Sequence, residues 1–239
     1  MRLINSYLTR IVMALCCMLC SVNTAIAVDG VIEINQAKAL AGNVTSGDAA
    51  GYPIYIKTSG SFRLTGNLTH STPIAAIIVE AANVTIDLNG FTISGSGSGT
   101  YDGILTWPTA INLEIRNGTV RNFGRYGINT QSYAPNARII NVRTTENGSD
   151  GIHLEGKGAL IQNCSSNVNG RYGIYSLGGA TIIGNNIRGN TSHGLSMSTG
   201  DGYGMNVLTE NNGGNANAQT TGFNVQIGTN VCGINTTCP

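Results

Sequence analysis

Two aspartates and a histidine are the residues of this chain whose types and spacing could carry out acid–base chemistry. Asp102 and Asp150 are each followed by Gly-Ile, and His153 comes three residues after Asp150. Two carboxyl groups can act as general acid and general base on a glycosidic bond, and an imidazole can donate or accept the proton. Asp102, Asp150 and His153 are therefore the candidate catalytic residues of a polysaccharide lyase or glycoside hydrolase.

Residues suited to binding sugar rings lie near these three in the sequence. Their side chains are aromatic, amide, imidazole and carboxylate groups, which combine apolar contact with directed hydrogen bonds. The candidate substrate-binding residues are Trp107, Tyr126, Asn129, Gln131, Glu155, Tyr172, Tyr175 and His193. They include the only tryptophan of the chain, so aromatic side chains are concentrated here although they are scarce elsewhere.

The aspartates also have a non-catalytic interpretation. Arg125 and Arg171 stand in the twice-used sequence Gly-Arg-Tyr-Gly-Ile, and Asp150 lies between them. In this interpretation Asp150 does no more than balance the charges of the two arginines, as surface ion pairs commonly do. No metal site is predicted, because the acidic residues do not cluster and His153 with Glu155 lacks a third ligand. No cofactor is predicted either.

A repeat indicates which elements position these residues. Gly-Ile or Gly-Leu recurs in steps of 24, 24, 22 and 21 residues, at Gly103, Gly127, Gly151, Gly173 and Gly194. Asparagine keeps nearly the same step in two series, Asn117, Asn141, Asn163, Asn185 and Asn206, and Asn122, Asn147, Asn169 and Asn190. The β-branched runs between these marks alternate with period two and predict short strands.

Short strands at a fixed step predict an all-β parallel β-helix solenoid of about seven to eight coils, with 21–24 residues per coil. Stacking in register predicts an aliphatic core ladder of Ile104, Ile128, Ile152, Ile174 and Leu195. The next column then faces outward and consists of Leu105, Asn129, His153, Tyr175 and Ser196. We expect asparagine to form ladders at the turns and glycine to supply their positive φ angles.

The same stacking estimates the spacing of the two candidate catalytic carboxylates. Asp102 and Asp150 would lie two coils apart, which corresponds to roughly 9–10 Å. This distance is near the upper end of the roughly 6.5–9.5 Å that separates the carboxyl groups of inverting glycosidases.

Several segments resemble bacterial secreted right-handed parallel β-helix repeat proteins. They are Gly60–Leu68, Asn83–Thr92, Ile115–Val120, Asn147–Ile152 and Val231–Pro239. The resemblance covers about Val31 to Pro239 and implies the right-handed architecture of the pectin-lyase-like superfamily. It implies no particular reaction, because this architecture hosts lyases, hydrolases, epimerases, adhesins and proteins without known activity.

The ends of the chain have their own signals. Residues 1–27 combine a basic start, an apolar run and Ala25-Ile26-Ala27, which is typical of a secretory signal peptide. We therefore expect a secreted or periplasmic protein without a membrane anchor in the mature chain. Residues 28–52 are predicted to form an N-terminal cap with a helix over Ile34–Ala41 ended by Gly42. Residues 53–239 are predicted to form the β-helix.

The six cysteines fall into two groups. Cys16, Cys17 and Cys20 lie in the predicted signal peptide, which leaves Cys164, Cys232 and Cys238. In an oxidising compartment, Cys232 and Cys238 are predicted to form a disulfide that holds the C-terminal tail. Cys164 is expected to be a small buried apolar residue, the alternative being a reactive thiol.

Composition narrows the function. With 10% charged residues and a net charge of +1, the chain has no basic stripe, so no nucleic-acid partner is expected. The 33 glycines disfavour a helical bundle. The preferred function is non-catalytic surface binding or a structural role, with extracellular or cell-wall polysaccharide as partner. The alternatives are a carbohydrate-active enzyme that uses the carboxylates and an adhesin-like scaffold.

Overall fold

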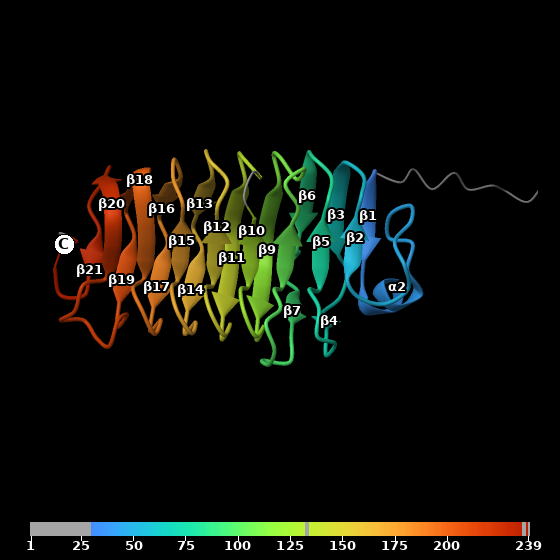
Figure 1. Cartoon of the computed structure of the whole chain (residues 1–239), viewed down its shortest axis with the longest axis horizontal. Helices are drawn as coiled ribbons and strands as arrows, with labels where there is room; N and C mark the ends of the chain where they lie inside the picture. The colour runs from blue at the N-terminus through green and yellow to red at the C-terminus, as the bar shows by residue number, and fades with distance from the viewer. Residues whose placement is uncertain (1–29, 132–133, 236–237, 239) are drawn as a thin grey trace, which may run out of the picture.

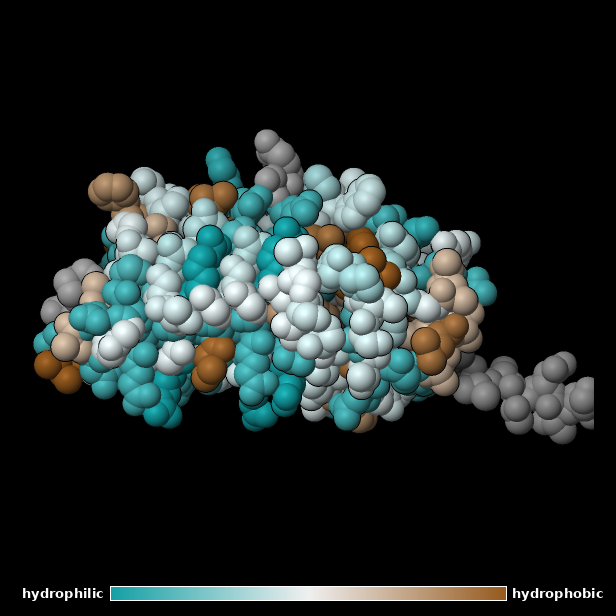
Figure 2. All heavy atoms as spheres, turned by 60° about the horizontal axis from the view of Figure 1, so that its bottom comes forward, coloured by the Kyte–Doolittle hydropathy of each residue, from teal (hydrophilic) through white to brown (hydrophobic). Residues whose placement is uncertain are grey.

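The chain winds into a rod of about seven turns in which parallel strands stack along the long axis (Figure 1). The computed structural model describes residues 30–131, 134–235 and 238, so the predicted signal peptide 1–27 lies outside the described residues. Figure 2 shows that one side of the rod is largely hydrophilic. The predicted all-β solenoid is confirmed.

Three faces of parallel strands make up the rod. Face 1 consists of β2 (Ile54–Ile56), β5 (Ile77–Val79), β8 (Ile104–Thr106), β10 (Ile128–Thr130), β12 (Ile152–Leu154), β15 (Ile174–Ser176) and the first residues of β18 (Leu195–Gly204) and β20 (Thr220–Gln226). Face 2 consists of β1 (Val31–Ile34), β3 (Gly60–Leu64), β6 (Val84–Asp87), the first halves of β9 (Glu114–Arg121) and β11 (Arg138–Thr145), β13 (Leu160–Gln162), β16 (Thr181–Ile183) and the last residues of β18 and β20. Face 3 consists of β4 (Leu68–Thr69), β7 (Thr92–Ser94), the second halves of β9 and β11, β14 (Ser165–Asn167), β17 (Asn186–Arg188), β19 (Val207–Thr209) and β21 (Val231–Cys232).

The core ladder on face 1 is the one that the repeat predicts. The strands pair in the register Ile104, Ile128, Ile152, Ile174 and Leu195. All five side chains are completely buried. Burial of an aliphatic side chain contributes about 1.5–3 kcal/mol, so this column is a major source of the stability of the rod.

The glycines of the Gly-Ile repeat serve a different purpose from the predicted one. None of them is among the positive-φ residues of the described chain. They are required because the surrounding chain leaves no room for a side chain: a Cβ at Gly151 would lie 2.0 Å from Ser166 Oγ of the same turn, and one at Gly127 would lie 2.7 Å from the carbonyl oxygen of Gly151 in the next coil. The prediction that these glycines make the turns was therefore wrong.

The two asparagine series each combine two structural positions. Asn117, Asn141 and Asn163 do adopt the predicted left-handed turn, with φ of 60°, 55° and 54°. The series then shifts by one residue, because Asn185 and Asn206 are buried and follow turn residues at positions 184 and 205.

The second series shifts in the same way at its start. Asn122 is a left-handed turn residue. The members that follow it are buried ladder residues, Asn147, Asn169, Asn190 and, beyond the predicted series, Asn211.

Each buried ladder residue satisfies backbone groups of its neighbours. Asn169 Oδ1 accepts hydrogen bonds from both the backbone nitrogen and the side-chain nitrogen of Asn147, at 3.2 and 3.0 Å. Its Nδ2 donates to Asn190 Oδ1 at 3.0 Å and to the carbonyl oxygen of Thr144 at 3.3 Å. The same side chain can therefore repeat from coil to coil with every polar atom paired.

A short helix covers the N-terminal end of the rod (Figure 1). Helix α2 spans Gln36–Ala41, with Asn35 as its N-cap and Gly42 at φ 78° as its C-cap, within one to two residues of the prediction. Strand β1 in the predicted cap segment already pairs with β3. The β-helix therefore begins before residue 53.

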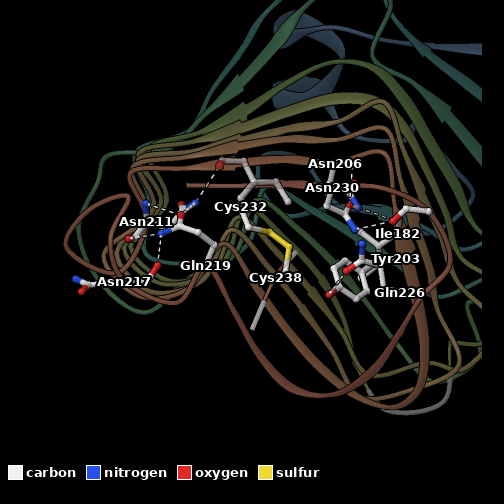
Figure 3. Close-up of a disulfide and its surroundings, with 12 residues drawn as sticks. Ile182, Tyr203, Asn206, Asn211, Asn217, Gln219, Gln226, Asn230, Cys232 and Cys238 are labelled. Atoms are coloured by element: carbon white, nitrogen blue, oxygen red, sulfur yellow. Dashed lines mark hydrogen bonds between the residues drawn. A yellow bond between two sulfur atoms is a disulfide. The ribbon is translucent and has the colours of Figure 1, made fainter. Parts of the chain in front are cut away.

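A disulfide lies at the C-terminal end of the rod, near the ends of the asparagine ladders (Figure 3). Cys232 and Cys238 form the predicted disulfide, with their Cα atoms 5.3 Å apart. Gln219 ends the buried ladder, because its Oε1 accepts from the backbone and side-chain nitrogens of Asn211 at 3.1 and 3.0 Å. Cys164 is buried, as predicted, and burial raises the pKa of its thiol to about 11, which makes it a poor nucleophile.

Replacing one buried ladder asparagine tests this account of stability. Asn169→Ala leaves the buried backbone nitrogen of Asn147 without its acceptor, so we expect the free energy of unfolding to fall by about 2–3 kcal/mol. Asn141→Gly is the control, because glycine keeps the exposed left-handed turn, and its effect should stay within about 0.5 kcal/mol. Urea unfolding followed by circular dichroism measures both. Equal losses would contradict the distinction between buried ladder and turn positions.

Candidate functional site

The outer side of face 1 carries an alternating pattern at the residue before each repeated glycine. This position is Asp102, Tyr126, Asp150 and Tyr172 in four successive coils. The two tyrosine coils carry an arginine one residue earlier. Stacked coils lie about 4.8 Å apart, so each aspartate has a tyrosine coil with its arginine as a neighbour instead of a second aspartate.

Asp102 is fully paired. Its Oδ1 accepts from Arg125 Nε at 2.7 Å and from the backbone nitrogen of Tyr126 at 3.2 Å. Its Oδ2 accepts from Arg125 Nη2 and, at 2.8 Å, from Asn129 Nδ2. The carboxylate is 1% exposed. The pKa of Arg125 is raised, chiefly by its hydrogen bonds to Asp102.

Asp150 repeats this arrangement two coils further along. Its Oδ1 accepts from Arg171 Nε at 2.7 Å and from the backbone nitrogen of Tyr172 at 3.1 Å, and its Oδ2 accepts from Arg171 Nη2 and His153 Nδ1. The carboxylate is completely buried. Burial by itself would raise the pKa of Asp150, but the hydrogen bonds from Arg171, His153 and the Tyr172 backbone outweigh it and lower that pKa.

This pairing bears directly on the candidate catalytic carboxylates. Each carboxylate receives four hydrogen bonds. A carboxylate has about four lone-pair sites, so neither Asp102 nor Asp150 can meet a ligand while its arginine is in place. Each aspartate binds one arginine, which comes from the following coil. Each aspartate thereby links its own coil to the next one.

His153 connects two carboxylates. Its Nδ1 lies 2.7 Å from Asp150 Oδ2 and its Nε2 lies 3.2 Å from Glu155 Oε1. A neutral imidazole can donate from only one nitrogen, whereas the imidazolium donates from both. His153 was expected to face outward, yet it is only 6% exposed, because aromatic rings of the neighbouring coils cover it.

The aromatic side chains stack on one another. The His153 ring lies between Tyr126 and Tyr175, with centroid distances of 4.2 and 4.5 Å and interplanar angles of 11° and 6°. Arg125 and Arg171 lie over the Tyr126 ring at 4.9 and 5.9 Å. The rings of His153, Tyr126 and Tyr175 therefore make face-to-face contacts within the protein.

A hollow opens beside this stack. It has a volume of about 210 Å³ and is lined by Arg125, Tyr126, Asn129, Gln131, His153 and Glu155. Five of these six residues are predicted site residues. The side chain of Glu155 is 27% exposed and that of Arg125 is 39% exposed, so the hollow offers a carboxylate, a guanidinium and a side-chain amide to a ligand.

The remaining predicted residues lie outside the lining of the hollow. Trp107 is 49% exposed and lies one coil before Gln131. Tyr172 stacks on Tyr175 with centroids 6.0 Å apart, and the His193 ring lies tilted against Tyr172 at 6.3 Å. Burial lowers the pKa of His193.

Sequence reasoning placed Arg125 and Arg171 on either side of Asp150 but did not count them among the substrate-binding residues, and it did not pair Arg125 with Asp102. The signal for Arg125 and Arg171 is the repeated Gly-Arg-Tyr-Gly-Ile, whose two copies follow the two Asp-Gly-Ile sequences by one coil.

Two further properties concern the described residues only. Residues 30–131, 134–235 and 238 contain no group of three or more His, Cys, Asp or Glu side chains that could hold a metal ion. In that same part of the chain, no helix has the length and apolar character needed to cross a membrane.

Comparison with known proteins agrees with this architecture. Residues 54–213 match the family described as the right handed beta helix region, and the chain belongs to that family. No curated protein sequence matches the chain.

Two solved structures share the fold. The A-module of the mannuronan C-5 epimerase AlgE4 of Azotobacter vinelandii is 16% identical, with a TM-score of 0.60 over 84% of this chain and 66% of that one. The enzymatically active domain of tailspike protein 2 of bacteriophage CBA120 is 16% identical, with a TM-score of 0.50 over 74% of this chain and 37% of that one. This chain thus spans just under two thirds and just over one third of their lengths.

The paired carboxylate makes a prediction about pH. Asp150 has a folded pKa below its ordinary value of 3.8. Its ionised form therefore stabilises the fold above about pH 4, and this stabilisation is lost as the pH falls through the lower folded value. Asp150→Asn should reduce the free energy of unfolding at neutral pH by roughly 3 kcal/mol, and the difference from wild type should shrink as the pH falls below the ordinary value of 3.8.

The matched control is Glu146→Gln, which breaks the ion pair of Arg121 with Glu146. Both side chains of that pair are about half exposed, at 46% and 50%, so a loss of less than about 1 kcal/mol is expected. Urea unfolding at a series of pH values measures both variants. A loss for Asp150→Asn that stays constant from neutral to acid pH would contradict the assigned pairing.

Proposed function

We propose that the outer side of face 1 binds a polysaccharide without converting it, and that the hollow lined by Arg125, Gln131 and Glu155 is the centre of this binding surface. The observation that carries the proposal is the set of directed polar groups at the hollow. A guanidinium, a carboxylate and an amide next to a tyrosine can hydrogen-bond several hydroxyl groups of one sugar residue.

The ligand proposed here is an extended chain that lies along the rod. The hollow is short, with a volume of about 210 Å³, whereas exposed Trp107 lies one coil before Gln131. An indole that is half exposed at this distance can pack against a second sugar ring. Two subsites on one rigid sheet favour a polymer over a free monosaccharide.

Binding is favoured over catalysis by the state of the acid–base groups. Asp102 and Asp150 are buried and saturated by hydrogen bonds, and both nitrogens of His153 face carboxylates. A general acid or base must come within about 2.6–3.2 Å of the atom it protonates or deprotonates. Glu155 is the one candidate acid–base residue of this group with substantial exposure.

A carbohydrate-active enzyme is the second candidate, and one observation favours it. Asp150, His153 and Glu155 form a chain of hydrogen bonds that ends at the hollow. Such a chain can hold a proton at Glu155 for transfer to a bound sugar. The two solved structures of similar fold include an epimerase and an enzymatically active domain, but at 16% identity they support the fold alone.

Location is part of the proposal. A secreted or periplasmic protein would meet extracellular or cell-wall polysaccharide, and the composition of residues 1–27 supports export. The disulfide between Cys232 and Cys238 is consistent with an oxidising compartment.

Binding is tested by calorimetric titration with a panel of acidic and neutral polysaccharides. With the polysaccharide that binds, Gln131→Ala and Trp107→Ala should each weaken affinity by roughly fivefold to thirtyfold, because each removes about 1–2 kcal/mol of direct contact. Matched controls are Gln162→Ala on face 2 and Leu40→Ala on α2, which is 56% exposed, and both should bind like wild type. Equal weakening in the controls would place the binding surface elsewhere.

Catalysis is tested on the same panel by following new unsaturated sugars, reducing ends and C-5 epimers. The proposal expects no turnover. Turnover that disappears in Glu155→Gln while Glu114→Gln on face 2 retains it would establish the enzyme and overturn the non-catalytic assignment. Absence of both binding and turnover would leave only a structural role.

A further inference from the structure

Face 3 carries two hollows of its own, in the lower part of the rod in Figure 1. The first has a volume of about 240 Å³ and is lined by Asn67, Leu68, Thr69, Thr92, Ser94 and Arg121. The second has a volume of about 230 Å³ and is lined by Gly90, Asn117, Gly118, Thr119, Asn141 and Arg143. Thr92 of the first hollow pairs in register with Thr119 of the second, so the two hollows are neighbours along the rod.

Each of these hollows contains one arginine and no acidic residue in its lining. The hollow on face 1 differs, because its lining includes Glu155 as well as Arg125. Asp87 touches the edge of the second hollow, since its Oδ1 accepts from Asn117 Nδ2 at 3.2 Å. This carboxylate is already paired with Arg116 at 3.1 Å. The two hollows of face 3 therefore present positive charge to a ligand.

The two guanidinium groups can both reach a ligand. Arg143 is exposed and takes part in none of the ion pairs in the part of the chain that the structure describes. Arg121 pairs with Glu146 at 3.2 Å, with side chains that are 46% and 50% exposed, and an exposed pair of this kind contributes about 0–1 kcal/mol. An anionic ligand can therefore bind Arg143 without breaking an ion pair and can displace Glu146 from Arg121 at a small cost in free energy.

The remaining lining groups suit a sugar better than a nucleobase. They include threonine and serine hydroxyls and asparagine amides, which can hydrogen-bond to sugar hydroxyl groups. Neither hollow has an aromatic residue in its lining, whereas single-stranded nucleic acids are bound largely by stacking of their bases on aromatic rings. In Figure 2 the lower side of Figure 1 comes forward, and the surface seen there is largely hydrophilic.

We propose that face 3 is a second binding surface and that its ligand is an acidic polysaccharide, with negatively charged groups held in the two hollows by Arg121 and Arg143. The ligand lies along the rod, because the hollows follow one another across coils that are about 4.8 Å apart. This surface does not depend on the one proposed on face 1. With both surfaces in place, one rigid rod holds two polysaccharide chains at once.

Calorimetric titration of the full chain at low ionic strength tests the proposal, with carboxymethyl dextran, dextran sulfate and unmodified dextran as probes. Binding of at least one of the two charged polymers is expected, without binding of the neutral one, and it should weaken as salt is added. Arg143→Gln should reduce the affinity by roughly fivefold to twentyfold, because it removes a charge-assisted hydrogen bond. Glu146→Gln should raise the affinity by roughly twofold to fivefold, because it removes the carboxylate that competes for Arg121.

Arg63→Gln is the matched control. Arg63 also has no ion pair among the described residues, but it lies on face 2, where its neighbours in register are Glu33 and Asp87. It loses the same charge as Arg143→Gln, so it should bind the charged dextran like wild type if position matters and not net charge. Gln131→Ala on face 1 should also leave this binding unchanged, which separates the two surfaces.

The outcomes that would overturn the proposal are distinct. They are absence of binding to both charged dextrans, equal weakening in Arg143→Gln and Arg63→Gln, and binding of single-stranded DNA as tight as that of the charged dextrans. Weakening in Gln131→Ala without weakening in Arg143→Gln would also overturn it, because the charged polymer would then lie on face 1. Circular dichroism establishes that each variant folds.

Discussion

Every coil of this protein is hydrogen-bonded in register to the next, about 4.8 Å away, and this spacing constrains every side chain on the rod. A residue in one coil is covered above and below by the residues at the same position in the adjacent coils. Aliphatic residues tolerate this, as the ladder from Ile104 to Leu195 shows. Asparagine tolerates it because its amide donates in one direction along the axis while its carbonyl accepts from the other. A carboxylate cannot do this, since it only accepts.

The arrangement of the candidate site follows from this constraint on stacked carboxylates. Asp102 and Asp150 share a column in which each is followed by a tyrosine coil, and that coil sends an arginine back to the aspartate before it. The arginines are thereby fixed over the tyrosine rings, and His153 is held in a stack between two of them. The hollow opens where Gln131 and Glu155 follow this stack. Because these contacts hold the side chains in place, the proposed binding surface would not need to reorganise in order to hydrogen-bond a ligand.

The period of the repeat made the fold predictable, but not the fine position of each polar residue. The Gly-Ile steps determine which isoleucines stack, because one residue type keeps one role throughout. The asparagine steps do not determine which asparagines stack. The exposed turn position and the buried ladder position are adjacent in the sequence, and both favour asparagine. The role of Gly151 was also hidden, since the atoms that exclude a side chain there belong to Thr144, earlier in the chain, and Ser166, later in the chain. In the candidate site, the sequence identified the column that contains His153 and Tyr175, but it did not show that these rings stack on one another.

The same constraint places a special requirement on the ends of the rod, because the ladders of buried residues stop there. Inside the rod, each coil supplies hydrogen-bond partners to the one before it, and among the buried polar side-chain atoms of the described residues only the hydroxyls of Thr106 and Thr130 lack a partner. Within the described chain, one buried asparagine ladder ends at Gln219, which takes the place of a further asparagine and donates to three backbone carbonyls. The end of a stacked column therefore needs a residue that accepts from the last asparagine and pairs its own donors with backbone carbonyls nearby, and Gln219 does both.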